Sequence, residues 1–261
     1  MFIQRLITLL ILIPLVVLGI FYANHGLLLG VVVLITLAAG SEYWQLIPIS
    51  NALMKAVFMV LLLLSVWACG CLFSYWQAVG LVLWVFVCIA VLTFPKSQNY
   101  WGYPTVVAGV SLLLFPLFVQ SLIHLYFLPQ GKSLLIYVLC LIWAADVGAY
   151  VAGKLWGKHK LIPEVSPGKS WEGGLGGFLL AMTVAAAGYM YYTPHFVFIW
   201  FVLAVTTVLI SIFGDLFISI LKRRCHVKDT GSVIPGHGGI LDRLDSLIAA
   251  LPVFYFGYSF F

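Results

Sequence analysis

The chain has 261 residues, of which 64% are hydrophobic and 8% are charged, and its formal net charge is +5. This composition excludes an ordinary soluble domain, whose apolar share is nearer half, and indicates a polytopic membrane protein. The modest positive charge gives no nucleic-acid footprint, so we expect the basic residues to meet anionic lipid headgroups or a polyphosphate.

About nine apolar windows approach or exceed the length that crosses roughly 30 Å of hydrocarbon as a helix. Because they are continuously apolar, helices are favoured over a barrel, whose strands would alternate apolar and polar residues. The sequence therefore predicts an all-α fold. The predicted spans, of which the second is the shortest, are 6–22, 27–40, 56–75, 78–94, 104–128, 134–153, 173–192, 196–221 and 244–261.

Lysines and arginines near span ends tend to stay in the cytoplasm, and this tendency gives the expected orientation. With the N-terminus inside, only Lys132 of the 13 basic residues falls outside. The loop 154–177 and the segment after residue 221 are then predicted to share the cytoplasmic face. Residues 1–22 also resemble a secretory signal, but no small-x-small cleavage site follows and further spans come directly after them.

The spans up to about residue 128 are expected to form a scaffold. Glu42, in the segment GSEYWQL, is interpreted as a solvated acid beside the interfacial aromatic residues Tyr43 and Trp44. The 5 cysteines show neither a disulfide framework nor a zinc pattern. One integral domain, 1–261, is expected, with 1–130 mainly scaffold and 131–261 the catalytic half.

Two aspartates fall within the apolar part of the second half, Asp146 in the sixth predicted span and Asp215 in the eighth. A carboxylate in a span is costly unless it faces a water-filled cavity, a cation or a basic partner, so a functional role is the first interpretation. The alternative is a buried, hydrogen-bonded acid that fixes helix packing.

The loop segment SPGKSWEGGLGG, at 166–177, offers Lys169 and Ser170 before a run of glycines. Both residues are candidates for binding an anionic substrate. In the alternative interpretation, Ser170 caps the next helix and Lys169 extends to the membrane interface. The lysines at 154, 158 and 160 are expected to face solvent or lipid headgroups.

Residues 219–246 read SILKRRCHVKDTGSVIPGHGGILDRLDS and concentrate charge and glycine. On a helix, Asp215, Ser219 and Lys222 share one stripe, with spacing i, i+4 and i+7. Asp242 and Asp245, at i and i+3, project together from the first turn of the last span. Since Mg²⁺ prefers carboxylate oxygens, Asp215 and Asp242 are predicted to hold a metal that carries a polyphosphate; the spacing leaves open whether one or two ions bind.

Between these helices, the glycine-rich run PGHGG at 235–239 can bring backbone N–H groups close to phosphate oxygens. His237 is expected to donate to phosphate, although a metal ligand or an ordinary turn histidine is also consistent with its position. Lys228 is a second phosphate candidate, with a local ion pair to Asp229 as the alternative.

The segments S-x-x-K-R, K-D-x-G, P-G-H-G-G and D-R-x-D-S occur in that order within 219–246, and DVGAYVAGKLWGKHKLIPEVSPGKSWEGGLGG precedes them at 146–177. In these motifs the chain resembles the phosphatidate cytidylyltransferase family, also called CDP-diacylglycerol synthases. The resemblance in motifs covers about residues 143–250. The first half matches only in hydropathy and in the short SEYW element.

The resemblance implies a reaction in which CTP and phosphatidate give CDP-diacylglycerol and pyrophosphate, with Mg²⁺ required. The sequence leaves open whether a monovalent ion also binds. It further implies a polar cavity open to the cytosol and the bilayer, a homodimer, and a place in the bacterial inner membrane. The catalytic residues are then Lys222, Ser219, Asp215 and Asp242, of which Asp215 and Asp242 hold the metal. Candidate substrate-binding residues are Asp146, Lys169, Ser170, Arg223, Lys228, Asp229, His237, Gly238, Gly239 and Arg243.

Two other functions remain as alternatives. A transporter or lipid flippase would place its charges near the middle of the membrane and show two matching halves, whereas here the charges gather at one face. A CTP-dependent lipid kinase would use a similar nucleotide site but would transfer the γ-phosphoryl group to a lipid alcohol.

Overall fold

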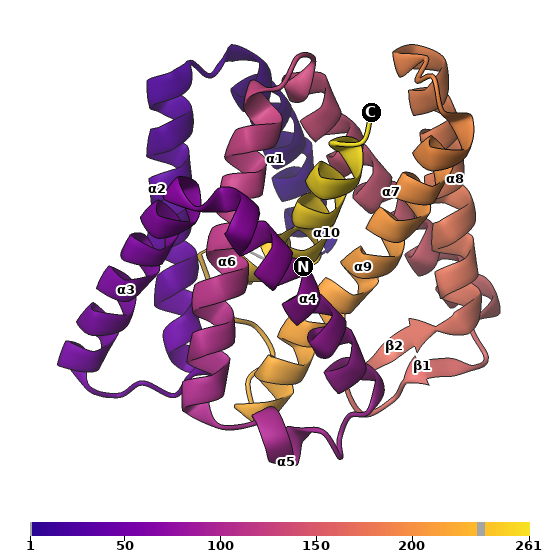
Figure 1. Ribbon diagram of the computed structural model, residues 1–261. Coiled ribbons are helices and arrows are strands. Elements are labelled where there is room, and N and C mark those ends of the chain that lie inside the picture. The colour runs from indigo at the N-terminus through magenta and orange to yellow at the C-terminus, as the bar shows by residue number, and fades with distance from the viewer. Residues whose placement is uncertain (1, 234–237) are drawn as a thin grey trace.

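The computed structural model describes residues 2–233 and 238–261, and most of the described chain is helical (Figure 1). The predicted all-α class is therefore confirmed. The long helices of the described residues are α1 (Phe2–Tyr22), α2 (His25–Leu46), α3 (Ala52–Cys71), α4 (Phe73–Leu92), α6 (Pro104–Phe127), α7 (Gly131–Trp156), α8 (Trp171–Tyr192), α9 (Val197–Arg224) and α10 (Leu241–Tyr258). The short elements are α5 (Gln98–Trp101), β1 (Lys160–Ile162) and β2 (Ser166–Ser170).

Among the described residues, 7 helices are long and apolar enough to cross a membrane: α2, α3, α4, α6, α7, α8 and α9. Helix α1 is apolar along Leu10–Tyr22, and α10 begins with a charged turn. The fold is thus that of a polytopic membrane protein, while the count of about nine crossings stays a prediction.

The sequence predicts that the second span is the shortest, and this prediction is wrong. Helix α2 continues for 22 residues to Leu46. Gly40 and Ser41 do not end the helix. The Ser41 hydroxyl donates to the carbonyl of Ala38 within the helix, and Gly40 lies so close to Met59 and Leu62 of α3 that a Cβ atom there would meet their side chains at 2.9 Å. Close packing against α3 therefore explains the glycine.

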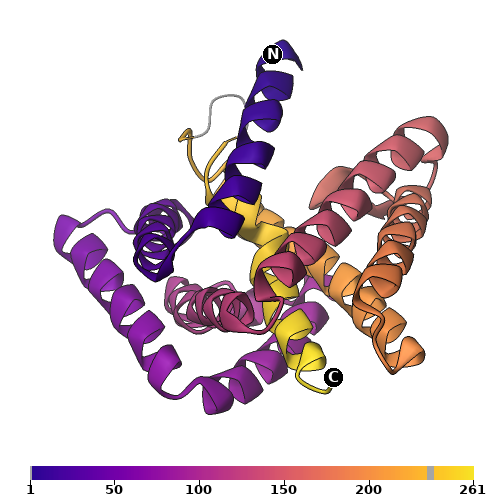
Figure 2. The same ribbon diagram turned by 90° about the horizontal axis from the view of Figure 1, so that it is seen from above.

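Helix α6 lies at the centre of the bundle, where it contacts α2, α3, α4, α7 and α10 (Figure 2). Its middle is fully buried, and the ring of Phe115 packs edge-on against Tyr43 of α2 at a centroid distance of 6.1 Å. Helices α3 and α4 lie outside it. Helices α2, α3 and α4 thus pack against one central helix, on which α10 also packs.

Helices α7 and α8 pack against each other along small residues. A Cβ atom at Gly148 would lie 2.5 Å from the carbonyl oxygen of Gly176, so the two backbones approach closely. The hairpin of β1 and β2 connects the two helices, although the sequence predicts a plain loop there. The α7–α8 pair thereby supports the hairpin at one end of the bundle (Figure 1).

The hairpin, the end of α2 and the end of α9 lie at this same end of the bundle. Arg223 donates from Nε to the Val165 carbonyl between the two strands, at 3.2 Å. Cys225 donates from Sγ to the carbonyl of Leu46, at 3.1 Å, and burial raises the pKa of this thiol, which keeps it protonated. The two basic segments of the second half therefore lie at the same end of the bundle, and their place on the cytoplasmic face stays a prediction.

Candidate active site

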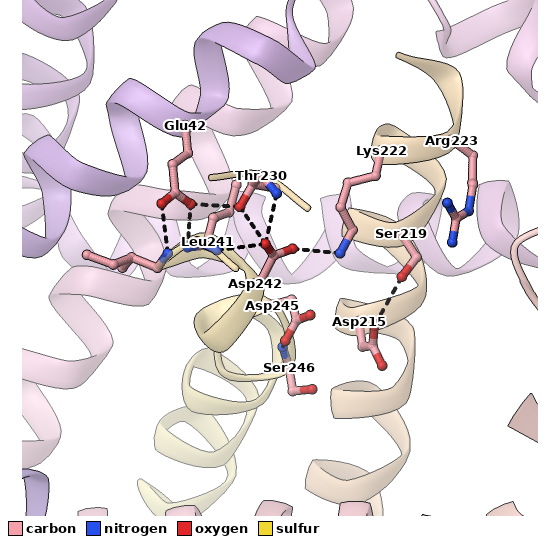
Figure 3. A network of polar contacts seen from close by, with 12 residues as sticks. Glu42, Asp215, Ser219, Lys222, Arg223, Thr230, Leu241, Asp242, Asp245 and Ser246 are labelled. Carbon is pink, nitrogen blue, oxygen red and sulfur yellow. Dashed lines mark hydrogen bonds and ion pairs between the residues drawn. The ribbon is translucent and has the colours of Figure 1, made fainter. Parts of the chain in front are cut away.

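The predicted stripe on α9 is present and faces α10. Ser219 lies one turn from Asp215, and its hydroxyl donates to Asp215 Oδ1 at 3.2 Å. One turn further on, Lys222 Nζ donates to Asp242 Oδ1, at 2.6 Å, across the space between the helices (Figure 3). The helical spacing thus brings the four predicted catalytic side chains into one region.

Asp242 lies at the start of α10 and is 8% exposed. Its Oδ2 accepts hydrogen bonds from the backbone N–H groups of Thr230, at 2.8 Å, and Gly239, at 3.0 Å. The ion pair with Lys222 is almost enclosed, with side-chain exposures of 11% for the lysine and 5% for the aspartate. Its charges are therefore balanced locally rather than by water.

Lys169 reaches the site from the hairpin. Its Nζ lies 2.6 Å from Oδ2 of Asp215, and the two side chains are 28% and 30% exposed. The sequence suggests a substrate-binding role for Lys169 but does not indicate which carboxylate it contacts. The hairpin thus supplies a cation to the acidic face of α9.

Two further aspartates lie within electrostatic range of Asp215, namely Asp146 from α7 and Asp245 from α10. Asp146 also interacts with the charges of Lys169 and Arg243. Its side chain lies at the surface of the described residues, and the alternative of an acid that fixes helix packing stays a prediction. Three helices therefore direct carboxylates toward one place, where negative charges repel each other unless cations are near.

The chemistry of these donors fits a hard divalent cation, because carboxylate and hydroxyl oxygens are its preferred ligands. Within the described part of the chain, no group of three or more His, Cys, Asp or Glu side chains is already arranged for a metal ion. The ammonium groups of Lys169 and Lys222 instead lie against Asp215 and Asp242. A metal ion at these carboxylates would therefore compete with both lysines.

Other predicted residues lie at the edges of the site. Ser170 caps α8, since its hydroxyl accepts from the N–H of Gly173 at 3.1 Å, and it is 4% exposed, so the capping interpretation is confirmed. Arg223 donates to the Val165 carbonyl and so contacts the hairpin rather than the carboxylates. Lys228 and Asp229 are exposed in the connection between α9 and α10, and a role for them in substrate binding stays a prediction.

The glycine-rich run is only partly described, because His237 lies outside the described residues. Gly238 has a positive φ of 83°, which favours glycine, and a Cβ atom there would lie 2.8 Å from Asp242 Oδ2. The N–H group of Gly239 donates to the same oxygen. Phosphate binding by Gly239 would therefore require its N–H group to leave Asp242.

The sequence interpretation of Glu42 as a solvated acid is wrong, because this side chain is 3% exposed. Its carboxylate accepts hydrogen bonds from the N–H groups of Ile240, at 2.7 Å, and Leu241, at 2.8 Å. Thr230, the variable residue of the K-D-x-G segment, also contacts it through its hydroxyl, at 2.7 Å. The adjacent Tyr43 and Trp44 made Glu42 resemble an interfacial residue, and no local spacing links it to α10.

Comparison with known proteins places this chain in a family. The model of the cytidylyltransferase family matches residues 3–261. A phosphatidate cytidylyltransferase of Pseudomonas aeruginosa is 38% identical over 261 residues, which cover 96% of this chain and 94% of the relative. One of Haemophilus influenzae is 40% identical over 205 residues, 68% of this chain and 66% of the relative. The chain belongs to the cytidylyltransferase family.

Proposed function

We propose that this enzyme transfers the cytidylyl group of CTP to phosphatidate, giving CDP-diacylglycerol and pyrophosphate for phospholipid biosynthesis. The observation that carries the proposal is the gathering of Asp215, Asp242 and their lysine partners between α9 and α10 in a chain of this family. A phosphate oxygen of phosphatidate bonds to the α-phosphorus of CTP. The bond from that phosphorus to the bridging oxygen breaks, and pyrophosphate leaves with the electron pair.

The phosphate of phosphatidate is already ionised near neutral pH, so the reaction needs no strong general base. It needs two polyanions to be brought together and aligned, and it needs the charge that develops on pyrophosphate to be stabilised. Lys169 and Lys222 carry the required positive charge at the carboxylate cluster. Arg243, Lys228 and His237 are further candidates, from their places in the motifs, for binding phosphate oxygens.

We also propose that one or two Mg²⁺ ions act in the reaction, held by Asp215 and Asp242. A bound divalent cation would neutralise phosphate charge and polarise the α-phosphate. Ser219, which donates to Asp215, would orient that carboxylate. Once the carboxylates are released, the ammonium groups of Lys169 and Lys222 become available for the phosphates of CTP.

Several apolar helices and the bacterial relatives support a multi-pass membrane protein. We propose that it lies in the inner membrane with this site on the cytoplasmic side, where CTP is available, and that it acts as a homodimer. The distribution of basic residues supports the orientation, since only Lys132 of the 13 falls outside.

Incorporation of CTP into lipid by the purified protein in detergent tests the activity. Label in the cytosine base should appear in the lipid only when phosphatidate and Mg²⁺ are both present. A lipid kinase would instead transfer label from the γ-phosphate and would accept diacylglycerol. Base label that stays out of the lipid under all conditions would refute the proposed activity.

A further inference from the structure

Glu42 is a buried carboxylate near the C-terminal end of α2, and the start of α10 is arranged around it (Figure 3). Its Oε1 accepts from the N–H of Ile240, and its Oε2 accepts from the N–H of Leu241. The ion pairs of the described residues do not include Glu42. Its charge is therefore stabilised by N–H groups at the beginning of a helix, where the helix dipole favours an anion.

Two glycines of the family motifs make room for this carboxylate. A Cβ atom at Gly231 would lie 2.7 Å from Glu42 Oε1, and one at Gly239 would lie 2.5 Å from the same atom. Real side chains essentially never come so close. The sequence predicts phosphate binding for Gly239, whereas the structure shows that both glycines allow Glu42 to enter the connection between α9 and α10.

Thr230 links Glu42 to Asp242. Its hydroxyl oxygen lies 2.7 Å from Glu42 Oε2 and 3.0 Å from Asp242 Oδ2, and its backbone N–H also donates to Asp242. A hydroxyl has a single hydrogen, so it donates to one of the two carboxylates at a time. A substitution of Glu42 therefore alters the hydrogen bonds available to Asp242 through Thr230, although Glu42 and Asp242 do not hydrogen-bond to each other.

We infer that Glu42 is a positioning residue for the transfer reaction, because its carboxylate fixes the first turn of α10 so that Asp242 faces Lys222. This inference rests on the proposed cytidylyl transfer. Glu42 contacts the backbone of α10 and Thr230, and it acts on the reacting groups only through Asp242. A residue with a purely structural role would change stability without a specific effect on kcat.

Glu42→Gln is the first test, because it keeps the size of the side chain but replaces an acceptor oxygen with an NH₂ group. That group would take the place of Oε1, which accepts from Ile240, or of Oε2, which accepts from Leu241 and Thr230, so at least one backbone N–H group loses its acceptor. In the full-length protein in detergent, kcat should fall about 100-fold, as expected when reacting groups are misplaced by about 1 Å. KM for CTP should change much less than kcat.

Hydrogen exchange gives a readout that does not need turnover. At least one of the amides of Ile240 and Leu241 should exchange faster in Glu42→Gln than in the parent protein, because the NH₂ group replaces the oxygen that this amide donates to. A parent protein that transfers no base label to lipid would refute the proposed activity, yet the exchange experiment would still test the contact. Unchanged exchange at both amides, or unchanged kcat in a folded Glu42→Gln protein, would overturn the inference.

Two more variants separate positioning from general damage to α2. Thr230→Val keeps both carboxylates but removes the hydroxyl between them, and its kcat should fall about tenfold, by analogy with loss of one hydrogen bond. Thr36→Val removes a buried hydroxyl of α2 that donates to Val32, outside this network, and should leave kcat unchanged. If Glu42→Gln fails to fold, an unchanged kcat in Thr230→Val overturns the inference, as does an equal loss in Thr36→Val.

Discussion

Lys222 Nζ lies 2.6 Å from Oδ1 of Asp242 and joins the last turn of α9 to the first turn of α10. Few charged pairs in the described chain are so enclosed, and the pair has a consequence for stability as well as for catalysis. Removal of one partner leaves the other charge buried and uncompensated, which typically costs about 3–5 kcal/mol. Removal of both charges costs much less.

Asp242→Asn should therefore lower both activity and thermal stability. The variant leaves the Lys222 ammonium without its carboxylate, so its melting temperature in detergent should fall clearly below that of the parent. The double variant Asp242→Asn with Lys222→Met should recover much of the lost stability but no activity. A double variant less stable than the sum of the two single changes would contradict the assigned pairing.

Asp215→Asn should separate catalysis from stability. Asp215 is 30% exposed and its partner Lys169 is 28% exposed, so loss of this ion pair should cost at most about 1 kcal/mol. As a proposed metal ligand, however, Asp215 should be needed for turnover, and kcat should fall about 10²–10³-fold with Mg²⁺ saturating. Because a loss of this size is expected for a metal ligand, activity above about a tenth of the parent value would exclude that role.

Lys169 should compete with a divalent cation for Asp215. Lys169→Met removes that competitor, so Mn²⁺, used as a paramagnetic substitute in the absence of nucleotide, should bind up to about fivefold more tightly. KM for CTP should rise about tenfold, because a charge-assisted contact to phosphate is lost. Electron paramagnetic resonance of free Mn²⁺ measures the first effect and initial rates measure the second.

Lys154→Met is the matched control for that experiment. Lys154 lies at the end of α7, and its Nζ is 5.9 Å from the centroid of the Tyr150 ring. Since its recorded contact is with an aromatic ring rather than a carboxylate of the site, its replacement should change neither Mn²⁺ affinity nor KM for CTP. Weaker Mn²⁺ binding in Lys169→Met would show that the lysine does not compete for Asp215.

The local part of the site follows from sequence spacing. Asp215, Ser219 and Lys222 share a helix face because their separations match the helical repeat, and the structure brings them together as expected. The positions of Asp242 and Asp245 near the start of a helix follow in the same way. Helical periodicity predicts which side chains share a face. A charged residue within a span predicts that this face meets a charged or polar group of another segment.

The contacts made by Glu42 and Lys169 could not be read from spacing. Glu42 binds residues of α10 that are far away in the chain, so only the packing of α2 beside α10 reveals its role. Lys169 reaches Asp215 through a hairpin whose strands have only 3 and 5 residues, too short for a clear alternating pattern. Both failures concern long-range contacts that depend on tertiary packing.

Cysteine labelling should test the orientation that places the site in the cytoplasm. His195 is exposed in the connection between α8 and α9, and Lys160 is exposed in the hairpin, at the other end of α8. In a Cys71→Ser background, which removes an exposed native thiol, a membrane-impermeant maleimide should label His195→Cys in intact cells with a permeabilised outer membrane. Lys160→Cys should react only after the inner membrane is opened, because the positive-inside tendency keeps the basic hairpin in the cytoplasm. The reverse pattern would place the carboxylate cluster outside, where CTP is absent, and the proposed reaction could not take place there.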